Sequence, residues 1–218
     1  SRGLGDVYKR QMESVLVGYN DPRLIKYYSK AEGGDIKDEK GNLIIAERNK
    51  IAGTYKGVPQ GTGVTVKDEN RYRLHSKSTI TKQTDAILMT AAEVWFLRAE
   101  AALRGFTSEN VKDCYEKGIT VSCQQWGVNV GDYLTSDATP SDYVDAFEAK
   151  YDVKALIKVT PKWDGGASPE EQLERILTQK WIACYPEGYE AWTEQRRTGY
   201  PQLFKVFVNN SGGAIDTN

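Results

Sequence analysis

The sequence predicts a mainly α-helical protein in which pairs of helices carry long loops. Apolar residues recur at spacings of three and four in several separate stretches, which is typical of amphipathic helices. Between these stretches, residues 31–83 are interrupted by many glycine turns and contain at most a short strand at residues 43–45. A loop segment of this length is usually functional or belongs to a loop-decorated scaffold.

Two helices in the middle of the chain form the clearest pair. Residues 86–104 carry apolar and small side chains at helical spacing, and Gly105 provides a stop. Ser108 is expected to cap a second helix that runs to about Gln125. A short turn between two helices makes them antiparallel. The residues at the small and aromatic positions of a tetratricopeptide-type helix pair are Ala99, Gly105, Tyr115 and Gly118, although no 34-residue period repeats.

Helices are also expected on both sides of this pair. Asp21-Pro22 predicts a short helix through Tyr28, since proline favours the first helical position. Thr139-Pro140 predicts a helix to Tyr151, because aromatic residues follow at a spacing of four. Ser168 before Pro169 and two acids predicts a helix to Ala183. The last helix is expected over residues 187–197.

Composition excludes several classes of protein. The chain has 218 residues with 29 Lys+Arg against 30 Asp+Glu, so it has no electrostatic footprint for nucleic acid. No apolar run approaches the roughly 20 residues that cross a bilayer. With 5 Trp, 13 Tyr and 5 Phe, the chain has enough aromatic mass to pack a core. We therefore expect a folded domain.

Cysteine and histidine usage indicates neither a disulfide framework nor a metal site. The three cysteines have no C-x-x-C spacing, and we expect them to be buried thiols. His75 is the only histidine, which excludes a His-pair metal site within the chain. We expect no metal and no cofactor.

The first eleven residues need an explanation of their own. Residues 6–11, Asp-Val-Tyr-Lys-Arg-Gln, are the translation of the end of a transposase sequencing adapter, and Met12 follows. We interpret residues 1–11 as an artefact of sequencing rather than a natural N-terminal strand. Residues 12–218 then form a fragment that is truncated at both ends.

The sequence contains no recognisable catalytic set. Residues 57–63 are glycine-rich but lack the Lys-Ser/Thr of a phosphate loop, so a turn cluster is favoured. The acidic window at residues 35–42 fails the EF-hand spacing and is better explained as a solvated turn. No G-x-S-x-G elbow is present. Carboxylates that could be nominated for glycoside hydrolysis carry no local signature: Glu93, Glu100, Glu187, Glu190 and Glu194.

Aromatic residues are the remaining functional signal. Aromatic faces in loops can stack on sugar rings without catalysis, and loops carry function more often than helices do. From loop position alone, the candidate ligand-binding residues are Tyr55, Tyr72 and Trp126. The helical tryptophans Trp95, Trp181 and Trp192 are instead expected in the core.

Two long motifs resemble one family. Residues 89–105 (MTAAEVWFLRAEAALRG) and residues 179–201 (QKWIACYPEGYEAWTEQRRTGYP) are similar to the SusD/RagB family, outer-membrane nutrient-binding lipoproteins of Bacteroidetes. A helix with the pattern Tyr115-x-x-Gly118-Ile119-x-x-Ser122 lies between them. The resemblance covers most of residues 12–218, the C-terminal part of a protein about twice as long. The lipoprotein signal, the lipidated cysteine and the closing Arg-rich segment of the family are absent from this sequence.

The resemblance implies an α-α superhelix of tetratricopeptide-like helix pairs with long ligand-facing loops. It also implies a surface-exposed lipoprotein of the outer membrane, held by an N-terminal lipid anchor outside this chain. Such a protein is a non-enzymatic subunit that binds a glycan, oligosaccharide or peptide and passes it to a SusC-like TonB-dependent transporter. The alternative is a helical-repeat module for protein–protein interaction. A carbohydrate hydrolase is more distant, because it needs two carboxylates at a fixed separation.

Overall fold

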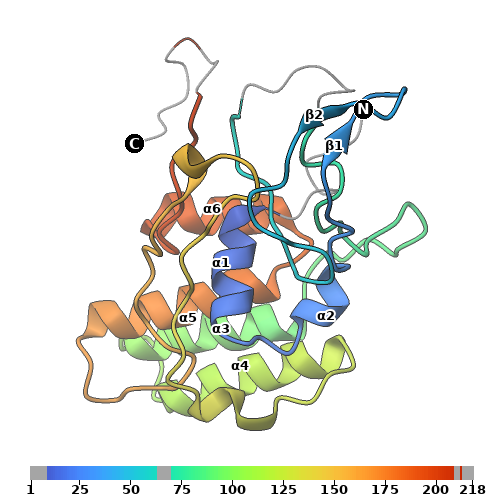
Figure 1. The fold of residues 1–218 in the computed structure, drawn as a ribbon. Coiled ribbons are helices and arrows are strands. Elements are labelled where there is room, and N and C mark those ends of the chain that lie inside the picture. Colours follow the sequence, from blue (N-terminus) through green and yellow to red (C-terminus); the bar gives the residue numbers. More distant parts are fainter. Residues whose placement is uncertain (1–8, 63–69, 209–211, 213–218) are drawn as a thin grey trace.

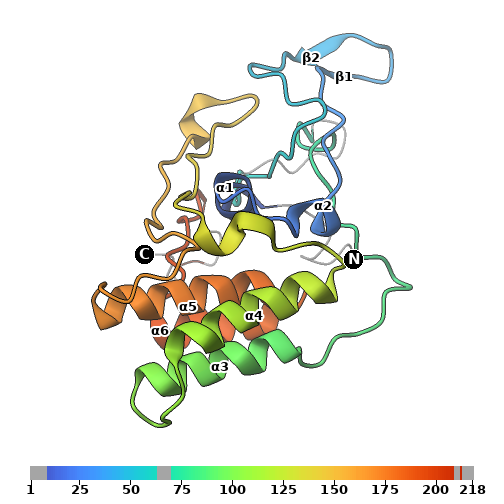
Figure 2. The same cartoon turned by 90° about the horizontal axis from the view of Figure 1, so that it is seen from below.

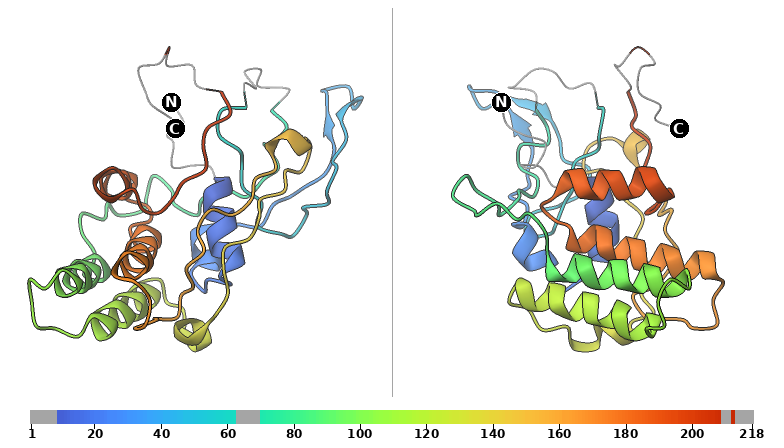
Figure 3. Two further views of the ribbon diagram at one scale, coloured as in Figure 1. Left: turned by 90° about the vertical axis from the view of Figure 1, so that its left-hand side faces the viewer. Right: turned by 180° about the vertical axis from the view of Figure 1, so that it is seen from behind.

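Four helices lie side by side and form the lower half of the molecule in Figure 1. They are α3 (Ala91–Leu103), α4 (Val111–Gln125), α5 (Pro169–Ala183) and α6 (Gly188–Thr198). In this computed structural model, which describes residues 9–62, 70–208 and 212, α5 packs against α3, α4 and α6 (Figure 3). The prediction of a mainly α-helical fold is confirmed, and so is the pairing of α3 with α4.

A loop-rich part covers one side of the helices. It contains α1 (Arg10–Gly18), the short α2 (Leu24–Tyr27) and the 3-10 helices η2 (Gly131–Thr135) and η3 (Ala149–Tyr151). Two short strands, β1 (Ile36–Lys37) and β2 (Leu43–Ile45), pair antiparallel as a hairpin. Figure 2 shows this hairpin projecting away from the helices. The expected strand at residues 43–45 is therefore confirmed.

Local capping explains where three helices begin. The side chains of Thr90, Asn110 and Ser168 each accept a hydrogen bond from the backbone N–H three residues later. This bond satisfies one of the free donors at a helix start. Ser168 also forms a reciprocal capping box with Glu171, as its sequence pattern indicates. At the end of α6, Gly199 has φ 81°, a left-handed conformation that glycine adopts at little cost.

The main hydrophobic core lies between the helices and the loop-rich part. Its buried members include Leu16 of α1, Phe96 of α3, Ile119 of α4 and Ile176 of α5. A second, smaller cluster lies under the turn-rich segment, around Ile36, Ile51, Tyr72 and Phe147. All three cysteines are buried and free, as expected.

A fully buried ion pair joins the loop-rich part to the helices. Arg23 Nη2 lies 2.6 Å from Asp21 Oδ2, and both side chains have 0% exposure. The guanidinium also donates to Ser122 Oγ of α4 at 3.0 Å and to Gln179 Oε1 of α5 at 2.9 Å. The Tyr133 hydroxyl donates to Asp21 Oδ2 at 2.7 Å and accepts from Gln179 Nε2 at 2.8 Å. Each member of this network therefore has a partner, which offsets the cost of burying charge.

A second buried cation fixes α6. Lys180 of α5 places its ammonium 3.0 Å from Glu190 and 3.1 Å from Glu194, both on α6. Burial alone would lower the pKa of Lys180, but hydrogen bonds and the charges of these carboxylates raise it above its ordinary value. Glu194 also binds Arg197, and Arg197 reaches Glu100 of α3. Ion pairs of Glu194 and Glu100 with Arg197 therefore extend this network over α5, α6 and α3.

The helix predicted over residues 139–151 is wrong. Tyr143 instead pairs with Val153 in an antiparallel bridge, and only η3 is helical. The carboxylate of buried Asp145 accepts hydrogen bonds from the backbone N–H groups of Phe147 and Glu148. This side chain replaces the helical partners of those amides, which is how aspartate competes with helix formation. The aromatic spacing of four reflects packing of an extended segment.

Other expectations need smaller corrections. The helix predicted from residue 86 begins at Ala91, because Thr90 caps it. Asn110 rather than Ser108 caps α4. Trp192 is 59% exposed and does not belong to the core, whereas Trp95 and Trp181 are partly buried and pack against the main core.

Helix α1 was not expected from the sequence. Its N-cap residue, Lys9, makes no side-chain cap bond. The helix is held by tertiary contacts: the Arg10 guanidinium lies 4.3 Å from the centre of the Phe207 ring, and Gln11 accepts from the Phe204 N–H at 2.7 Å. The adapter origin of residues 1–11 stays a prediction.

In the part of the chain that the structure describes, no helix combines the length and apolar character needed to span a membrane.

Large apolar side chains are exposed at the edge of the helices. The most exposed apolar side chains on or next to α3 and α6 are Leu88, Met89, Phe106, Tyr189 and Trp192.

Neutralising Asp21 is expected to destabilise the fold strongly. Asp21→Asn leaves the buried Arg23 guanidinium without its counter-charge, which typically costs about 3–5 kcal/mol. The matched control is Asp85→Asn, since Asp85 is exposed. Urea denaturation of both variants measures the difference, and equal unfolding free energies would contradict the role given to the ion pair.

Two glycine-to-alanine changes should act in opposite directions. A Cβ at Gly118 would lie 2.8 Å from the ring of buried Phe96, so Gly118→Ala should cost about 1–3 kcal/mol by overpacking α3 against α4. A Cβ at Gly188 meets nothing within 4 Å, so Gly188→Ala should be neutral or stabilise α6 by up to about 1 kcal/mol. Thermal unfolding distinguishes the two. A stabilising Gly118→Ala would show that the helices do not pack as described.

Candidate ligand-binding groove

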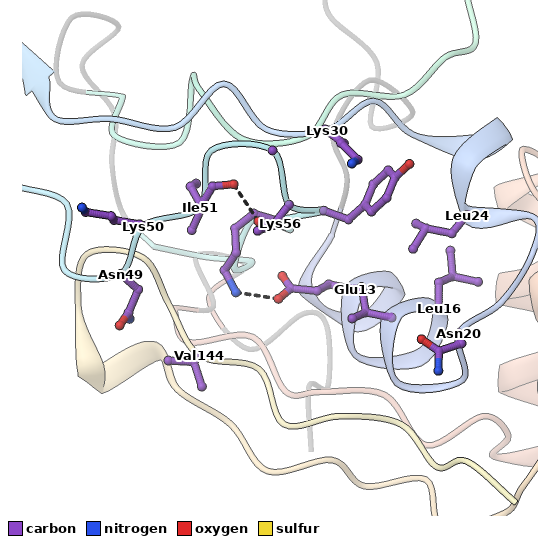
Figure 4. Close-up of a pocket in the computed structure, with 14 residues that line it drawn as sticks. Glu13, Leu16, Asn20, Leu24, Lys30, Asn49, Lys50, Ile51, Lys56 and Val144 are labelled. Atoms are coloured by element: carbon purple, nitrogen blue, oxygen red, sulfur yellow. Dashed lines mark hydrogen bonds and ion pairs between the residues drawn. The ribbon is translucent and has the colours of Figure 1, made fainter.

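A groove lies between α1 and the loop of residues 49–56 (Figure 4). Its volume is 540 Å³, within the range of small-molecule sites. The lining residues are Glu13, Leu16, Val17, Asn20, Leu24, Lys30, Asn49, Lys50, Ile51, Gly53, Thr54, Tyr55, Lys56 and Val144.

One face of α1 forms a wall of this groove. Glu13, Leu16 and Val17 follow each other at spacings of three and one, which places them on the same side of the helix, and Asn20 lines the groove after the helix has ended. The opposite face of α1 enters the core through Val15 and Tyr19. Asn20, two residues beyond the end of α1, has a left-handed conformation, φ 52°, which asparagine tolerates better than most residues. Helix α1 therefore contributes to both the core and the groove, and fully buried Leu16 lies where the two meet.

Hydrogen bonds fix the loop that forms the other wall. The Ala31 N–H donates to Thr54 O at 2.8 Å, and the Gly53 N–H donates to Ala31 O at 2.9 Å, so residues 30–31 lie beside residues 53–54. The Asn49 side chain donates to Asp145 O at 2.9 Å, which ties the loop to residues 145–152. The loop is thus held at both ends, and a held wall lowers the entropic cost of binding.

A nearly buried ion pair forms part of the base of the groove. The Lys56 ammonium lies 2.5 Å from Glu13 Oε1, and the Gly57 N–H donates to Glu13 Oε2 at 2.6 Å. Burial outweighs these interactions and raises the pKa of Glu13 to about 7. Lys56 also lies 4.4 Å from the centre of the Tyr143 ring. The pair joins α1 to the loop, and Figure 4 shows its two side chains reaching toward each other.

The structure places the three predicted binding residues in different surroundings. Tyr55 is half-buried and lines the groove. Tyr72 is buried in the smaller core cluster. Trp126 follows the end of α4 and packs on Tyr27, with ring centres 4.7 Å apart. The structure does not bring the three aromatic residues together, and only Tyr55 lies in the groove.

His75 occupies the apolar surroundings of Tyr72. Its ring centre is 5.1 Å from that of Tyr72 and 5.9 Å from that of Phe147. Neither ring nitrogen has a hydrogen-bond partner in the described residues. Burial, with a smaller contribution from Lys56, lowers the pKa of His75 to about 3. The imidazole is therefore neutral at physiological pH, away from the groove.

Sequence reasoning missed the polar residues of the groove. Lys30, Lys50, Asn20 and Asn49 are ordinary surface residues in sequence, and none belongs to a motif. The one available signal was the length of the turn-rich segment, which predicted a functional loop. Their common position depends on α1, which the sequence did not predict.

The groove is suited to binding. Its lining offers several apolar side chains, one aromatic side chain, two amides and two exposed ammonium groups beside the Glu13–Lys56 pair. This mixture of apolar surface and a few polar groups is typical of small-molecule sites. Among the described residues, no group of three or more metal-ligating side chains is present.

Comparisons with known proteins agree on one family. The family model described as SusD-like, "Susd and RagB outer membrane lipoprotein", matches residues 6–218. A search of curated proteins gave no significant match.

Solved structures are similar to this chain over most of its length. A SusD homologue from Bacteroides vulgatus is 48% identical, with a TM-score of 0.82 over 95% of this chain and 40% of its own. A chitin-binding SusD homologue from Flavobacterium johnsoniae is 36% identical, with a TM-score of 0.80 over 97% of this chain and 41% of its own. A SusD homologue from Bacteroides thetaiotaomicron is 36% identical, with a TM-score of 0.78 over 93% and 40%. The chain thus spans about two fifths of the length of these relatives.

The buried imidazole should make the protein sensitive to acid. The folded-state pKa of His75, about 3, lies below the ordinary 6.5, so the stability present above pH 6.5 is lost as the pH falls toward 3, by about 1.4 kcal/mol per pH unit. Glu13 acts oppositely: its folded-state pKa of about 7 is raised from 4.5, so its contribution is full below pH 4.5 and is lost as the pH rises through 7.

His75→Gln should remove the loss of stability in acid that His75 causes, and it should leave the opposite contribution of Glu13 unchanged. The unfolding free energy of the variant relative to the original protein should rise by about 2 kcal/mol between pH 7 and pH 5. Urea denaturation at both values measures this change. Parallel pH profiles for the two proteins would show that His75 titrates normally.

Proposed function

The chain belongs to the SusD-like family, and from this premise we propose that it is part of a nutrient-binding subunit of a SusCD-type outer-membrane uptake complex. The subunit binds a glycan or oligosaccharide, or a peptide, without catalysis. It transfers this ligand to a SusC-like TonB-dependent transporter. It acts at the cell surface as a lipoprotein, attached through an N-terminal lipid anchor.

The observation that supports this proposal most is the match to the family model over residues 6–218. The family is described as an outer membrane lipoprotein, and one relative is described as chitin-binding. The groove adds chemical support. Tyr55 offers an aromatic face for a sugar ring, and the nearby amides and ammonium groups can hydrogen-bond hydroxyl groups.

The second candidate is a module for protein–protein interaction. Exposed Tyr189 and Trp192 on α6 favour it, since aromatic residues are enriched at interfaces. An interaction module would differ from a nutrient-binding subunit in the genes that lie beside its own gene and in the ligand that it binds.

Gene context tests the proposal. Reading the source DNA upstream of Met12 should give a longer reading frame with a lipoprotein signal, beside a gene for a TonB-dependent transporter. The same reading tests whether residues 1–11 are adapter-derived. A reading frame with neither a lipoprotein signal nor a neighbouring transporter gene would favour the interaction module.

Loss of the groove aromatic should weaken ligand binding. In the product of the complete reading frame, Tyr55→Ala should bind an oligosaccharide identified by glycan array at least tenfold more weakly, about 1.4 kcal/mol. Tyr189→Ala is the control, since Tyr189 is 89% exposed on α6 and lies outside the groove. Isothermal titration calorimetry measures both affinities. Equal loss in both variants would contradict the groove as the site, and turnover of the bound glycan would contradict a non-enzymatic role.

A further inference from the structure

We propose that the groove selects acidic oligosaccharides, whose sugars carry carboxylate or sulfate groups. This inference rests on the proposed function and adds the chemical class of the ligand. It begins from the charges in the groove, which differ from those of the whole chain. The chain has 29 basic and 30 acidic residues, but the groove lining contains three lysines and a single acid.

The acid and one lysine neutralise each other. Glu13 and Lys56 form an ion pair at 2.5 Å with side chains only 10% and 9% exposed. The remaining charges of the lining are Lys30 and Lys50, which are exposed and form no ion pair within the described residues. Two cations of the lining, one on each side of the groove, are therefore available to an anionic ligand.

Carboxylates close to the loop are already engaged. Glu47 accepts hydrogen bonds from the Ile51 and Gly34 N–H groups, at 3.0 and 3.2 Å. Glu32 pairs with Lys77 at 2.9 Å, and Asp152 pairs with Arg48 at 2.8 Å. Glu32 and Asp152 are thus paired with other cations, and among the described residues Lys30 and Lys50 form no ion pair.

The position of Lys30 relative to Tyr55 suits an acidic sugar. Backbone hydrogen bonds between residues 31 and 53–54 hold the segment of Lys30 beside the segment of Tyr55. A sugar ring stacked on an aromatic face directs its ring substituents sideways, toward groups at the edge of the ring. The ammonium of Lys30 can bind a carboxylate or sulfate there through a charge-assisted hydrogen bond.

The two cations are spaced along the groove. Figure 4 shows Lys50 and Lys30 on opposite sides of Ile51 and Lys56, with the ammonium of Lys50 directed away from α1. This arrangement suits a ligand with repeated anionic groups, such as an oligomer of acidic sugars, better than one charged monosaccharide. Binding should therefore weaken with salt, since exposed charges are screened.

Calorimetry with matched ligands tests the proposal in the product of the complete reading frame. The probes are an oligogalacturonate with its methyl ester, and a sulfated galactan oligosaccharide with its desulfated form. We expect at least one acidic probe to bind tenfold or more tightly than its neutral counterpart. In Lys30→Gln/Lys50→Gln this preference should disappear, while Lys30→Arg/Lys50→Arg should retain it. Lys117→Gln is the control, because Lys117 is exposed on α4 and lies outside the groove.

Each negative result of these experiments leads to a different conclusion. Equal binding of acidic and neutral probes, with loss in Tyr55→Ala, would overturn the charge selection and leave the proposed function standing. An acidic preference that persists in Lys30→Gln/Lys50→Gln would overturn the assignment to these lysines. Absence of binding to any glycan, on the array and by calorimetry, would overturn this inference together with a glycan-binding function.

Discussion

The buried ion pair between Asp21 and Arg23 is the interaction on which the rest of the structure depends. It follows the end of α1 directly, and it contacts α4 through Ser122 and α5 through Gln179. A buried charge without a partner is costly, so the turn after α1 can occupy only the position that satisfies all these groups. The position of α1 relative to the helices is therefore set at its C-terminal end. Because α1 also forms a wall of the groove, the same ion pair helps to place the groove.

A second constraint of the same kind acts at the next residue of α5, Lys180. Lys180 is buried within α5, and α6 must cover it with the carboxylates of Glu190 and Glu194. This orientation of α6 leaves Trp192 on the outside, with Arg196 5.2 Å from the centre of its ring. A polar requirement thus overrides the tendency of a large aromatic residue to be buried.

Because of these constraints, the helices and the segment of residues 30–56 have different roles. The helices supply a rigid support, while the segment of residues 30–56 supplies groups whose positions are fixed by backbone bonds to Ala31 and by the Glu13–Lys56 pair. Rigid walls reduce the ordering cost of binding, and exposed polar groups at the rim can differ between relatives without affecting the core. Variation in ligand choice within one family is compatible with this arrangement.

The sequence by itself determined the elements that local chemistry controls. The cap at Ser168 and the apolar periodicity of α3 and α4 act within a few residues, so their pattern was visible in the chain. The family could also be recognised from the sequence, because the two motifs at residues 89–105 and 179–201 are continuous stretches of helical residues. Only the tertiary structure decided the path of residues 139–153, where Asp145 replaces helical hydrogen bonds, and the formation of α1, which lacks a local cap. It also decided the site: of the three loop aromatics only Tyr55 lines the groove, because side-chain exposure depends on contacts between segments far apart in sequence.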